Sequence, residues 1–168
     1  MMGEEIVGIM ADAQTVRDAA RRRSGFVDVL VFRLGGERFA VGLAAIEEVI
    51  DLPELRPMPH MPPIMLGVCD VRADLTAVYT PGPVLGVRGG ATRHAIIARS
   101  ATDGRRAGLA IEEAEGVIAF DFEGLMPPAN ADGVVLGVSM RGGQLLAIVD
   151  VESLVTACAS ADRVLETP

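Results

Sequence analysis

The chain contains two stretches that look like edited copies of one another. GVCDVRADLTAVYT covers residues 67–80, and GVSMRGGQLLAIVD covers residues 137–150. In both, strand-forming residues flank a short turn, which is the pattern of a β-hairpin. The later copy turns with Gly142-Gly143, whereas the earlier one has Arg72-Ala73. Because glycine is the residue that tight hairpin turns favour, the arginine needs a separate explanation.

Further matches extend this duplication along the chain. The matching pairs are Gly42-Leu43 with Gly108-Leu109, Val49-Ile50 with Val117-Ile118, Met61-Pro62-Pro63 with Met126-Pro127-Pro128, and Leu66-Gly67-Val68 with Leu136-Gly137-Val138. They occur in the same order in both halves, which indicates a repeat of about 65 to 70 residues.

The strand pattern within each repeat predicts the fold class. From Phe26 onward, short β-branched or alternating runs are separated by turn residues roughly every 8 to 12 positions. We therefore expect a mainly β fold of two small five-stranded antiparallel β-barrels that share a hydrophobic core. The first barrel should cover about residues 25–90 and the second about 91–150.

Helices are expected at both ends of this double barrel. Residues 1–24 form an N-terminal extension in which helical spacing of apolar residues predicts a helix over 3–22. A short C-terminal helix is predicted over 150–160, with Asp150 as its cap and with Leu154, Val155 and Cys158 facing inward. Residues 161–168 are expected to form a tail.

Composition and charge exclude several classes of function. The net charge is −8 and the only basic run is Arg21–Arg23, which is too short to indicate a positively charged surface for binding nucleic acid. No apolar run reaches the roughly 20 residues of a membrane helix, and no secretory signal is expected at the N-terminus. Cys69 and Cys158 are far apart in the sequence and each lies in a largely apolar stretch, which is typical of reduced thiols in a protein core. A cytoplasmic protein without direct membrane insertion is expected.

Groups for catalysis or metal binding are scarce. Ser139 in GVSMRG misses the nucleophile-elbow pattern by one residue, and no phosphate-binding glycine motif occurs. Thioether and imidazole ligands gather between residues 58 and 65, but prolines interleave them, so a stiff linker is favoured over a copper site; these ligands are Met58, His60, Met61 and Met65. We expect no catalytic residue, no cofactor and no metal.

Two carboxylate pairs, Glu47-Glu48 and Glu112-Glu113, stand at comparable places in the two halves. Neighbouring residues of a strand point to opposite faces, so neither pair is suited to concerted acid-base catalysis. Carboxylates that protect an edge strand from aggregation are the simpler interpretation.

Several segments together resemble the CheW adaptor family of bacterial chemotaxis systems. The resemblance covers about residues 26–158; it is carried by FRLGGERFAVGLAAIEEVI, MPHMPPIMLGVCDVRADLTAVYT, AGLAIEEAEGVI and VVLGVSMRGGQLLAIVDVESLV. It implies a CheW-like domain over 25–160 that acts as a scaffold without catalysis. The implied partners are the cytoplasmic tips of chemoreceptors and the regulatory domain of a CheA-type histidine kinase, and the implied location is a receptor array.

The resemblance also implies a partner-binding site. Glu48 matches the family's strand carboxylate, and Arg72 matches the arginine of its N-L-R-G turn, so the two should form a salt bridge. The other residues that match or adjoin the receptor-facing surface are Ile46, Val49, Gly67, Ala73 and Val117. This chain has Asp70-Val71-Arg72-Ala73 in place of N-L-R-G. The departure at Ala73 predicts a specialised paralogue with an altered partner preference.

Two other classes of function remain open from the sequence. One is a small-ligand-binding or enzymatic domain with a site between the barrels, for which His94, Tyr79 and Glu112 are the candidate polar groups. The other is a regulatory module of a larger kinase-like protein; a predicted N-terminal helix that starts close to the initiator methionine favours a complete adaptor instead.

Overall fold

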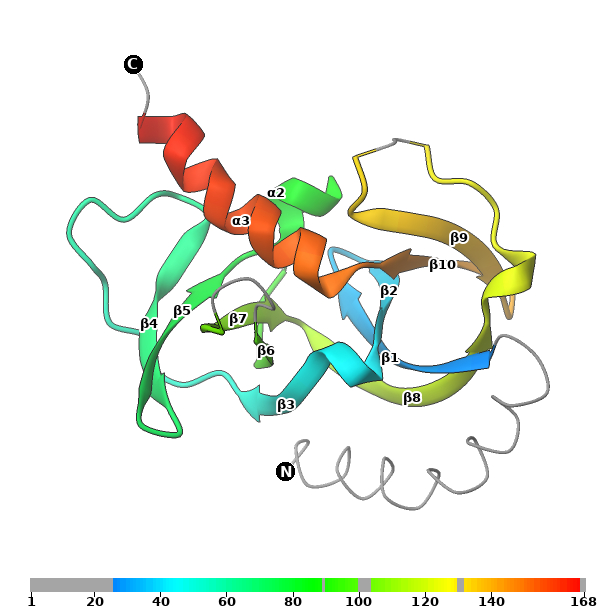
Figure 1. Cartoon of the computed structure of the whole chain (residues 1–168), viewed down its shortest axis with the longest axis horizontal. Coiled ribbons are helices and arrows are strands. Elements are labelled where there is room, and N and C mark those ends of the chain that lie inside the picture. The colour runs from blue at the N-terminus through cyan, green and yellow to red at the C-terminus, as the bar shows by residue number, and fades with distance from the viewer. Residues whose placement is uncertain (1–25, 89, 100–103, 130–131, 167–168) are drawn as a thin grey trace.

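A computed structural model describes residues 26–88, 90–99, 104–129 and 132–166 (Figure 1). The predicted helix over 3–22 and the extension 1–24 that contains it lie outside these residues. Within the described chain, no helix is long and apolar enough to cross a membrane.

Ten strands, two α-helices and two short 3₁₀ helices make up the described fold. They are β1 (Phe26–Leu34), β2 (Glu37–Gly42), η1 (Leu43–Ala45), β3 (Ile46–Asp51), β4 (Met65–Val71), β5 (Asp74–Tyr79), α2 (Gly82–Leu85), β6 (His94–Arg99), β7 (Arg106–Ile111), β8 (Glu113–Asp121), η2 (Phe122–Gly124), β9 (Val135–Arg141), β10 (Gln144–Val149) and α3 (Val151–Glu166). The prediction of five short strands in each half is confirmed.

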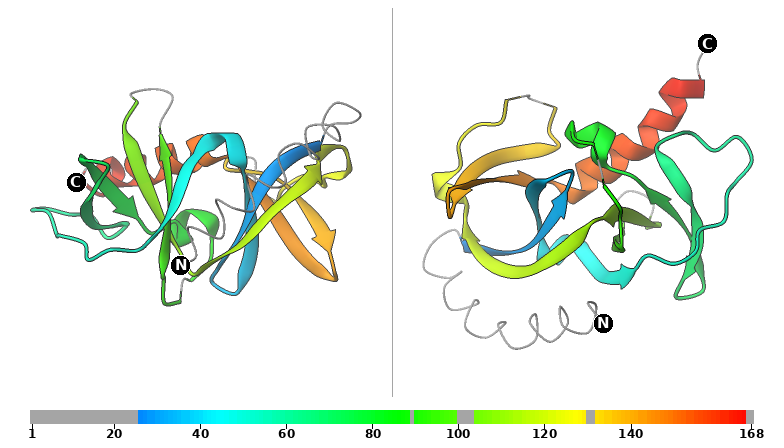
Figure 2. Two further views of the ribbon diagram at one scale, coloured as in Figure 1. Left: turned by 90° about the horizontal axis from the view of Figure 1, so that it is seen from below. Right: turned by 180° about the vertical axis from the view of Figure 1, so that it is seen from behind.

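The strands form two five-stranded sheets that lie side by side (Figures 1 and 2). Sheet A has the strand order β8-β1-β2-β10-β9, and sheet B has the order β3-β6-β7-β5-β4. Each sheet therefore takes strands from both halves of the sequence. The expected division into a first barrel at 25–90 and a second at 91–150 does not coincide with the sheets.

The expectation of closed, all-antiparallel barrels is wrong. β10 pairs with β2 in parallel, and β5 pairs with β7 in parallel. Strands joined by a tight hairpin must be antiparallel, but these partners come from different halves and are free of that constraint. The edge strands also do not pair with each other along their length. The described chain next to each open edge makes one isolated bridge, Met126 with Val138 in sheet A and Arg56 with Val68 in sheet B.

The two sheets are related by an internal two-fold pattern. Each strand of the first half corresponds to the strand five places later in the chain, so β1 corresponds to β6 and β5 to β10. When every strand is exchanged for its counterpart, the strand order of sheet A becomes that of sheet B. The register confirms the pairing of Val49 with Val117, which face the equivalent residues Ile96 and Leu30. It also confirms the pairing of Gly67 with Gly137, each of which packs against the segment that bridges its edge strand.

Two of the sequence matches are displaced in the structure. Met126 occupies the place of Arg56 because the two residues make the equivalent edge bridges, so Met126-Pro127-Pro128 does not correspond to Met61-Pro62-Pro63. Leu109 occupies the place of Val41, since these residues face Tyr79 and Val149 in the two parallel pairings. The match of Leu109 with Leu43 is therefore wrong by two residues.

The predicted shared hydrophobic core is confirmed. One large cluster includes residues from both sheets and from α3, among them Phe32, Leu109 and Leu154, none more than 1% exposed. Phe32 and Phe39 stack within it, with ring centroids 5.6 Å apart. Smaller apolar clusters lie within sheet A and within sheet B. The larger cluster packs the two sheets and α3 together as one body.

The C-terminal helix begins where it was predicted and extends further. Asp150 accepts hydrogen bonds from the Ser153 backbone N–H at 3.2 Å and from its hydroxyl at 2.5 Å, which caps the first turn. Leu154, Val155 and Cys158 are buried, as expected. α3 runs to Glu166 rather than to residue 160, and Figure 1 shows it leaving the end of β10 and crossing toward β4 and β5.

Candidate functional site

The turn between β4 and β5 has the backbone of a glycine turn without its glycines. Arg72 has φ 51° and Ala73 has φ 67°, close to the 59° and 78° of Gly142 and Gly143 in the equivalent turn. Two successive residues with positive φ are the pattern of a type I′ hairpin turn. Side chains at such positions cost about 1 kcal/mol or more each. The turn therefore keeps the geometry of its duplicate at a conformational cost.

An ion pair links this turn to the far edge of the same sheet. Arg72 Nε donates to Glu48 Oε2 at 2.5 Å, which confirms the predicted salt bridge. Glu48 lies on β3 at one edge of sheet B, and Arg72 follows β4 at the other. The Arg72 side chain is 67% exposed and that of Glu48 is 21% exposed. The pair thus spans the two edges of the open sheet while presenting a guanidinium to solvent.

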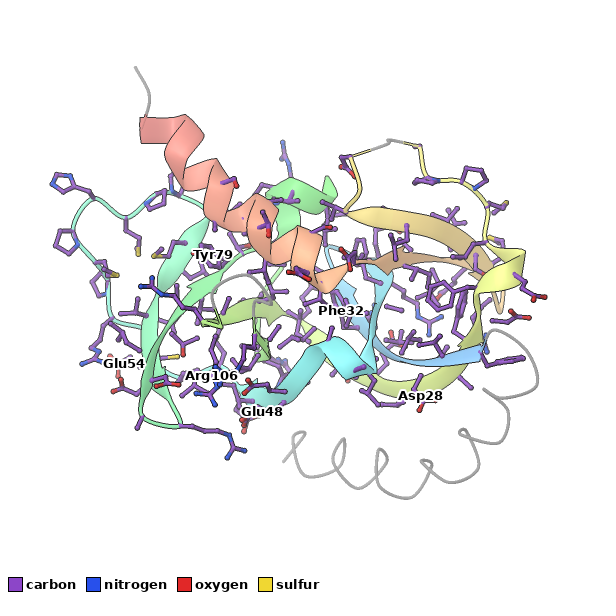
Figure 3. The ribbon with its side chains drawn as sticks, in the orientation of Figure 1. Asp28, Phe32, Glu48, Glu54, Tyr79 and Arg106 are labelled. Atoms are coloured by element: carbon purple, nitrogen blue, oxygen red, sulfur yellow. The ribbon has the colours of Figure 1, made fainter. Side chains whose placement is uncertain are left out.

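A second group of charges lies beside this pair. Glu47 accepts hydrogen bonds from Arg99 at 2.7 Å and from Arg106 at 2.8 Å, and Arg106 also pairs with Asp74. Figure 3 shows Glu48 and Arg106 close together at this end of sheet B. A β-bulge between Ile46 and Glu48 interrupts the pairing with β6. Both neighbouring carboxylates can therefore join one charged cluster, contrary to the expectation of opposite faces.

Hydrogen bonding sets the ionisation of the Glu47 group. The bonds from Arg106, and then those from Arg99, hold the pKa of Glu47 below its ordinary value, because they favour the charged carboxylate. The same bond to Glu47 raises the pKa of Arg106 further. Glu47 and Arg106 are therefore both charged at neutral pH, and the cluster is a fixed ionic structure rather than a proton-transfer site.

The Glu47 group has a duplicate in sheet A. Glu115 on β8 accepts from Arg38 Nη2 at 3.0 Å and Nε at 3.3 Å, and Arg33 Nε lies 3.9 Å from it. Arg33 and Arg38 face each other at the end of the β1–β2 hairpin, just as Arg99 and Arg106 do at the end of β6–β7. A glutamate held by two arginines is therefore a repeated element of the fold.

The Arg72–Glu48 pair has no such duplicate. The position equivalent to Glu48 is Gly116, and the position equivalent to Arg72 is Gly142. The conserved geometry of both turns shows that the arginine is not required to turn the chain. The pair is an addition to one half, which makes it the best candidate for a functional site.

The other predicted partner-binding residues lie mostly inside the protein. Val49 is 7% exposed and Val117 is 5% exposed, and both belong to the shared core. Ile46 packs partly against the same cluster. Gly67 is buried, and a Cβ on it would lie 2.9 Å from the Arg56 carbonyl oxygen. Ala73 is exposed beside Arg72. Binding by these residues stays a prediction, and only Glu48, Arg72 and Ala73 offer accessible atoms at the turn.

Of the polar groups considered for a small-ligand site, Glu112 has hydrogen-bond partners, whereas the buried His94 Nδ1 makes no hydrogen bond within the described chain. Both Glu112 Oε2 contacts are backbone amides, from Gly35 at 2.6 Å and from Gly90 at 2.8 Å. His94 Nδ1 lies 3.2 Å from Asp51 Oδ1, and Tyr79 is buried in the shared core. These contacts do not favour an enzymatic site between the sheets. Among the described residues, no group of three or more His, Cys, Asp or Glu side chains could hold a metal ion.

Sequence reasoning missed the Glu115 group because it paired the wrong carboxylates. Glu47-Glu48 corresponds to Glu115-Gly116 and not to Glu112-Glu113, since Val49 corresponds to Val117. The signal was present in the sequence, where EEVI at 47–50 aligns with EGVI at 115–118. That alignment also exposes the replacement of Glu48 by a glycine.

Comparison with known proteins agrees with the duplicated fold. The chain is 23% identical over 138 residues to the chemotaxis protein CheW of Rhizobium meliloti (strain 1021), covering 78% of this chain and 88% of that protein. Its structure is similar to that of the scaffolding protein TtCheW from Thermoanaerobacter tengcongensis, with a TM-score of 0.67 and 20% identity over 77% of this chain and 92% of the other. The family model for the CheW-like domain matches residues 28–159, and the chain therefore belongs to the CheW-like domain family.

Proposed function

We propose that this protein is a non-catalytic signalling adaptor that couples chemoreceptor tips to a CheA-type histidine kinase in the cytoplasm. The observation that carries the proposal is the Arg72–Glu48 pair, which fixes an exposed charge on a turn of the CheW-like fold. The names of the two relatives, a chemotaxis protein and a scaffolding protein, support the same class of function.

The surroundings of Arg72 support a protein partner rather than a small ligand. Leu75 follows the turn on β5 and is 62% exposed. A fixed guanidinium on a turn that is followed by an accessible apolar side chain provides the polar and apolar contacts that protein interfaces combine. Arginine is also among the residues that contribute most to binding at such interfaces.

Reversal of the charge at this turn tests the receptor contact. Arg72→Glu places a carboxylate opposite Glu48 and removes the guanidinium, so binding to a receptor-tip helical hairpin should fall by at least tenfold, or about 1.4 kcal/mol. Titration calorimetry or a pull-down with the purified hairpin measures this, and circular dichroism confirms that the variant is folded.

Arg141→Glu is the matched control for that experiment. Arg141 is an exposed arginine next to the equivalent turn of sheet A, so its reversal changes the net charge equally at the other hairpin. Binding should survive this change. Unaltered binding by a folded Arg72→Glu variant, or equal losses in both variants, would remove the Arg72 turn from the receptor contact.

We also propose that Ala73 distinguishes this adaptor from its relatives. The family pattern has glycine after the arginine of the turn, and the Cβ of Ala73 adds a methyl group to the exposed surface at φ 67°. Ala73→Gly should therefore strengthen binding to receptor tips that match the usual adaptor and weaken binding to the chain's own receptor. No change in the ratio of the two affinities would leave Ala73 without a role in partner choice.

The kinase partner needs a separate measurement. Size-exclusion chromatography of the full chain with the regulatory domain of a CheA-type kinase should give a 1:1 complex that elutes ahead of either protein alone. The Arg72→Glu variant should still form this complex if the receptor and kinase use different surfaces. Independent elution of the two wild-type proteins at micromolar concentration would argue against an adaptor for that kinase.

A further inference from the structure

The chain between β3 and β4 carries the thioether and imidazole ligands that stand out in the sequence. Figures 1 and 2 show this segment as a loop that projects from sheet B. Arg56 exchanges two backbone hydrogen bonds with Val68, both at 2.9 Å, and the Met65 N–H donates to the Pro62 carbonyl oxygen at 3.0 Å. The stretch between these contacts, 57–61, is Pro-Met-Pro-His-Met. A short stretch with two prolines is therefore fixed at both ends.

This stretch is turned rather than straight. The chain turns at Pro59 and His60, and His60 has φ 57°, in the left-handed region. An extended proline-rich chain has negative φ at every residue, so the stiff linker expected from the sequence is bent at His60. Met58 and Met61 stand at the two ends of the turn, and the end residues of a β-turn have Cα atoms within about 7 Å of each other. The turn therefore brings two thioether residues and a histidine to one point of the loop.

The side chains at this turn are accessible and have no structural partner that would occupy them. Met58 is 43% exposed, His60 is exposed and Met61 is partly exposed. Neither methionine belongs to an apolar cluster, and within the described chain His60 makes no hydrogen bond or ion pair. Met65 packs against the shared core instead, so it is not a candidate ligand. Three ligand side chains therefore remain accessible at the turn.

The duplicate of this stretch shows that its methionines and histidine are not needed to join the strands. Residues 57–61 correspond to 127–131, because the edge bridges that precede them are equivalent. The stretch 127–131 is Pro-Pro-Ala-Asn-Ala. The linkers that contain the two stretches, 52–64 and 122–134, are equally long. The thioether and imidazole groups are therefore an addition to one half, as the Arg72–Glu48 pair is.

We propose that Met58, His60 and Met61 form a binding site for copper(I). Thioether sulfur and imidazole nitrogen are ligands that suit this ion, whereas magnesium and calcium prefer oxygen. The fixed ends of the loop and its prolines limit the conformations that the free loop loses on binding. The proposal departs from the expectation of no metal, which rested on a stiff linker. It is independent of the receptor contact at Arg72, because it concerns a different loop.

The test titrates the full chain with silver(I), a redox-stable substitute for copper(I), and follows ¹³C-labelled methionine methyl groups by NMR. The chain has eight methionines, and saturable shifts at one ion per chain should be confined to Met58 and Met61, with a change at the His60 ring nitrogens. Zinc(II) prefers thiolate, imidazole and carboxylate ligands, so it should not shift these methyl groups. Equal responses to the two ions, or silver(I) shifts confined to the surroundings of the buried Cys69 and Cys158, would overturn the proposal.

Variants with matched controls then measure the contribution of each ligand to the copper(I) affinity, by anaerobic competition with the chelator bicinchoninate. Met58→Leu with Met61→Leu nearly conserves volume at accessible positions, so it should fold normally and lower the affinity at least tenfold. His60→Asn keeps a residue that tolerates positive φ and should also lower it about tenfold. Met126→Leu with Met140→Leu removes two exposed methionines of the other half and should leave the affinity unchanged. Undiminished affinity in the first double variant, or equal losses in both double variants, would assign the ion to another place.

Discussion

The Arg72 end of sheet B and the Gly142 end of sheet A have the same backbone conformation and differ in their side chains. Both have a turn with two successive positive φ angles, and both have a glutamate between two arginines at the end of a hairpin. Among the residues that the structure describes, only those at the Arg72 end form an ion pair across the sheet. The duplication therefore separates features that the fold needs, which recur, from features that one half has added.

The same distinction, between residues that recur in both halves and residues that do not, can be applied to the binding residues that the family resemblance implies. Val49 and Val117 are equivalents of each other and lie in the shared core. Gly67 and Gly137 are equivalents that each pack against the segment bridging the edge strand. Their recurrence in both halves is explained by packing. Arg72 and Glu48 do not recur, and packing does not explain them.

Alanine at the buried glycines should have the largest effect and should affect both halves alike. The new Cβ of Gly67→Ala would lie 2.9 Å from both the Arg56 carbonyl oxygen and the Leu55 Cβ, and the Cβ of Gly137→Ala would lie 2.9 Å from the Met126 carbonyl oxygen. Each substitution should lower the free energy of unfolding by about 2–4 kcal/mol, measured by urea denaturation.

Gly42→Ala is the control for these variants. Gly42 has φ −60°, and nothing lies within 4 Å of a Cβ added there. Its substitution should change the free energy of unfolding by less than about 1 kcal/mol in either direction. A large loss at Gly67 without one at Gly137 would show that the two bridging segments are not equivalent.

Sequence patterns were sufficient for the strands but not for their pairing. Alternation and turn residues locate strands such as β4 and β5 because those signals are local. The exchange of β3 and β8 between the sheets depends on contacts between distant segments, which no local pattern records. The bulge between Ile46 and Glu48 also had no signal in the sequence, although this bulge decides which side chains contact Arg106. The Arg72–Glu48 pair was predictable only through the family resemblance.

Exchange of alanine and glycine between the two turns should have opposite effects on stability. Ala73→Gly relieves a side chain at φ 67° and should raise the free energy of unfolding by about 0.5–1 kcal/mol, after the added chain entropy of glycine is subtracted. Gly143→Ala places a side chain at φ 78° and should lower it by about 1 kcal/mol. Changes of the same sign would show that the turns differ in backbone and not only in sequence.

A double-mutant cycle should detect coupling at one end only. The interaction energy between Glu48→Ala and Arg72→Ala should be about 0.5 kcal/mol, because most of the Arg72 side chain is in water and the pair is screened. The equivalent cycle of Gly116→Ala with Gly142→Ala should give additive changes. Coupling should also weaken as salt is raised from low ionic strength. Equal coupling in both cycles would mean that it is transmitted by the backbone rather than by the ion pair.

Glu112 provides the smallest expected effect and tests a feature confined to the second half. Hydrogen bonds from Gly90 and then Gly35 hold its pKa below the ordinary value, and they join the chain segment between β5 and β6 to the β1–β2 turn.

Because the folded pKa is the lower one, the stability that this carboxylate contributes is complete above the ordinary carboxyl range. It is lost as the pH falls through the folded pKa. Glu112→Gln should therefore unfold at lower urea than the wild type at pH 7, and the two midpoints should converge as the pH is lowered through and below the ordinary carboxyl range. The equivalent residue of the first half is Ala44, which has no charge to titrate. If the difference between the wild-type and Glu112→Gln midpoints stayed constant down to acid pH, the effect would come from packing at Glu112 and not from its ionisation.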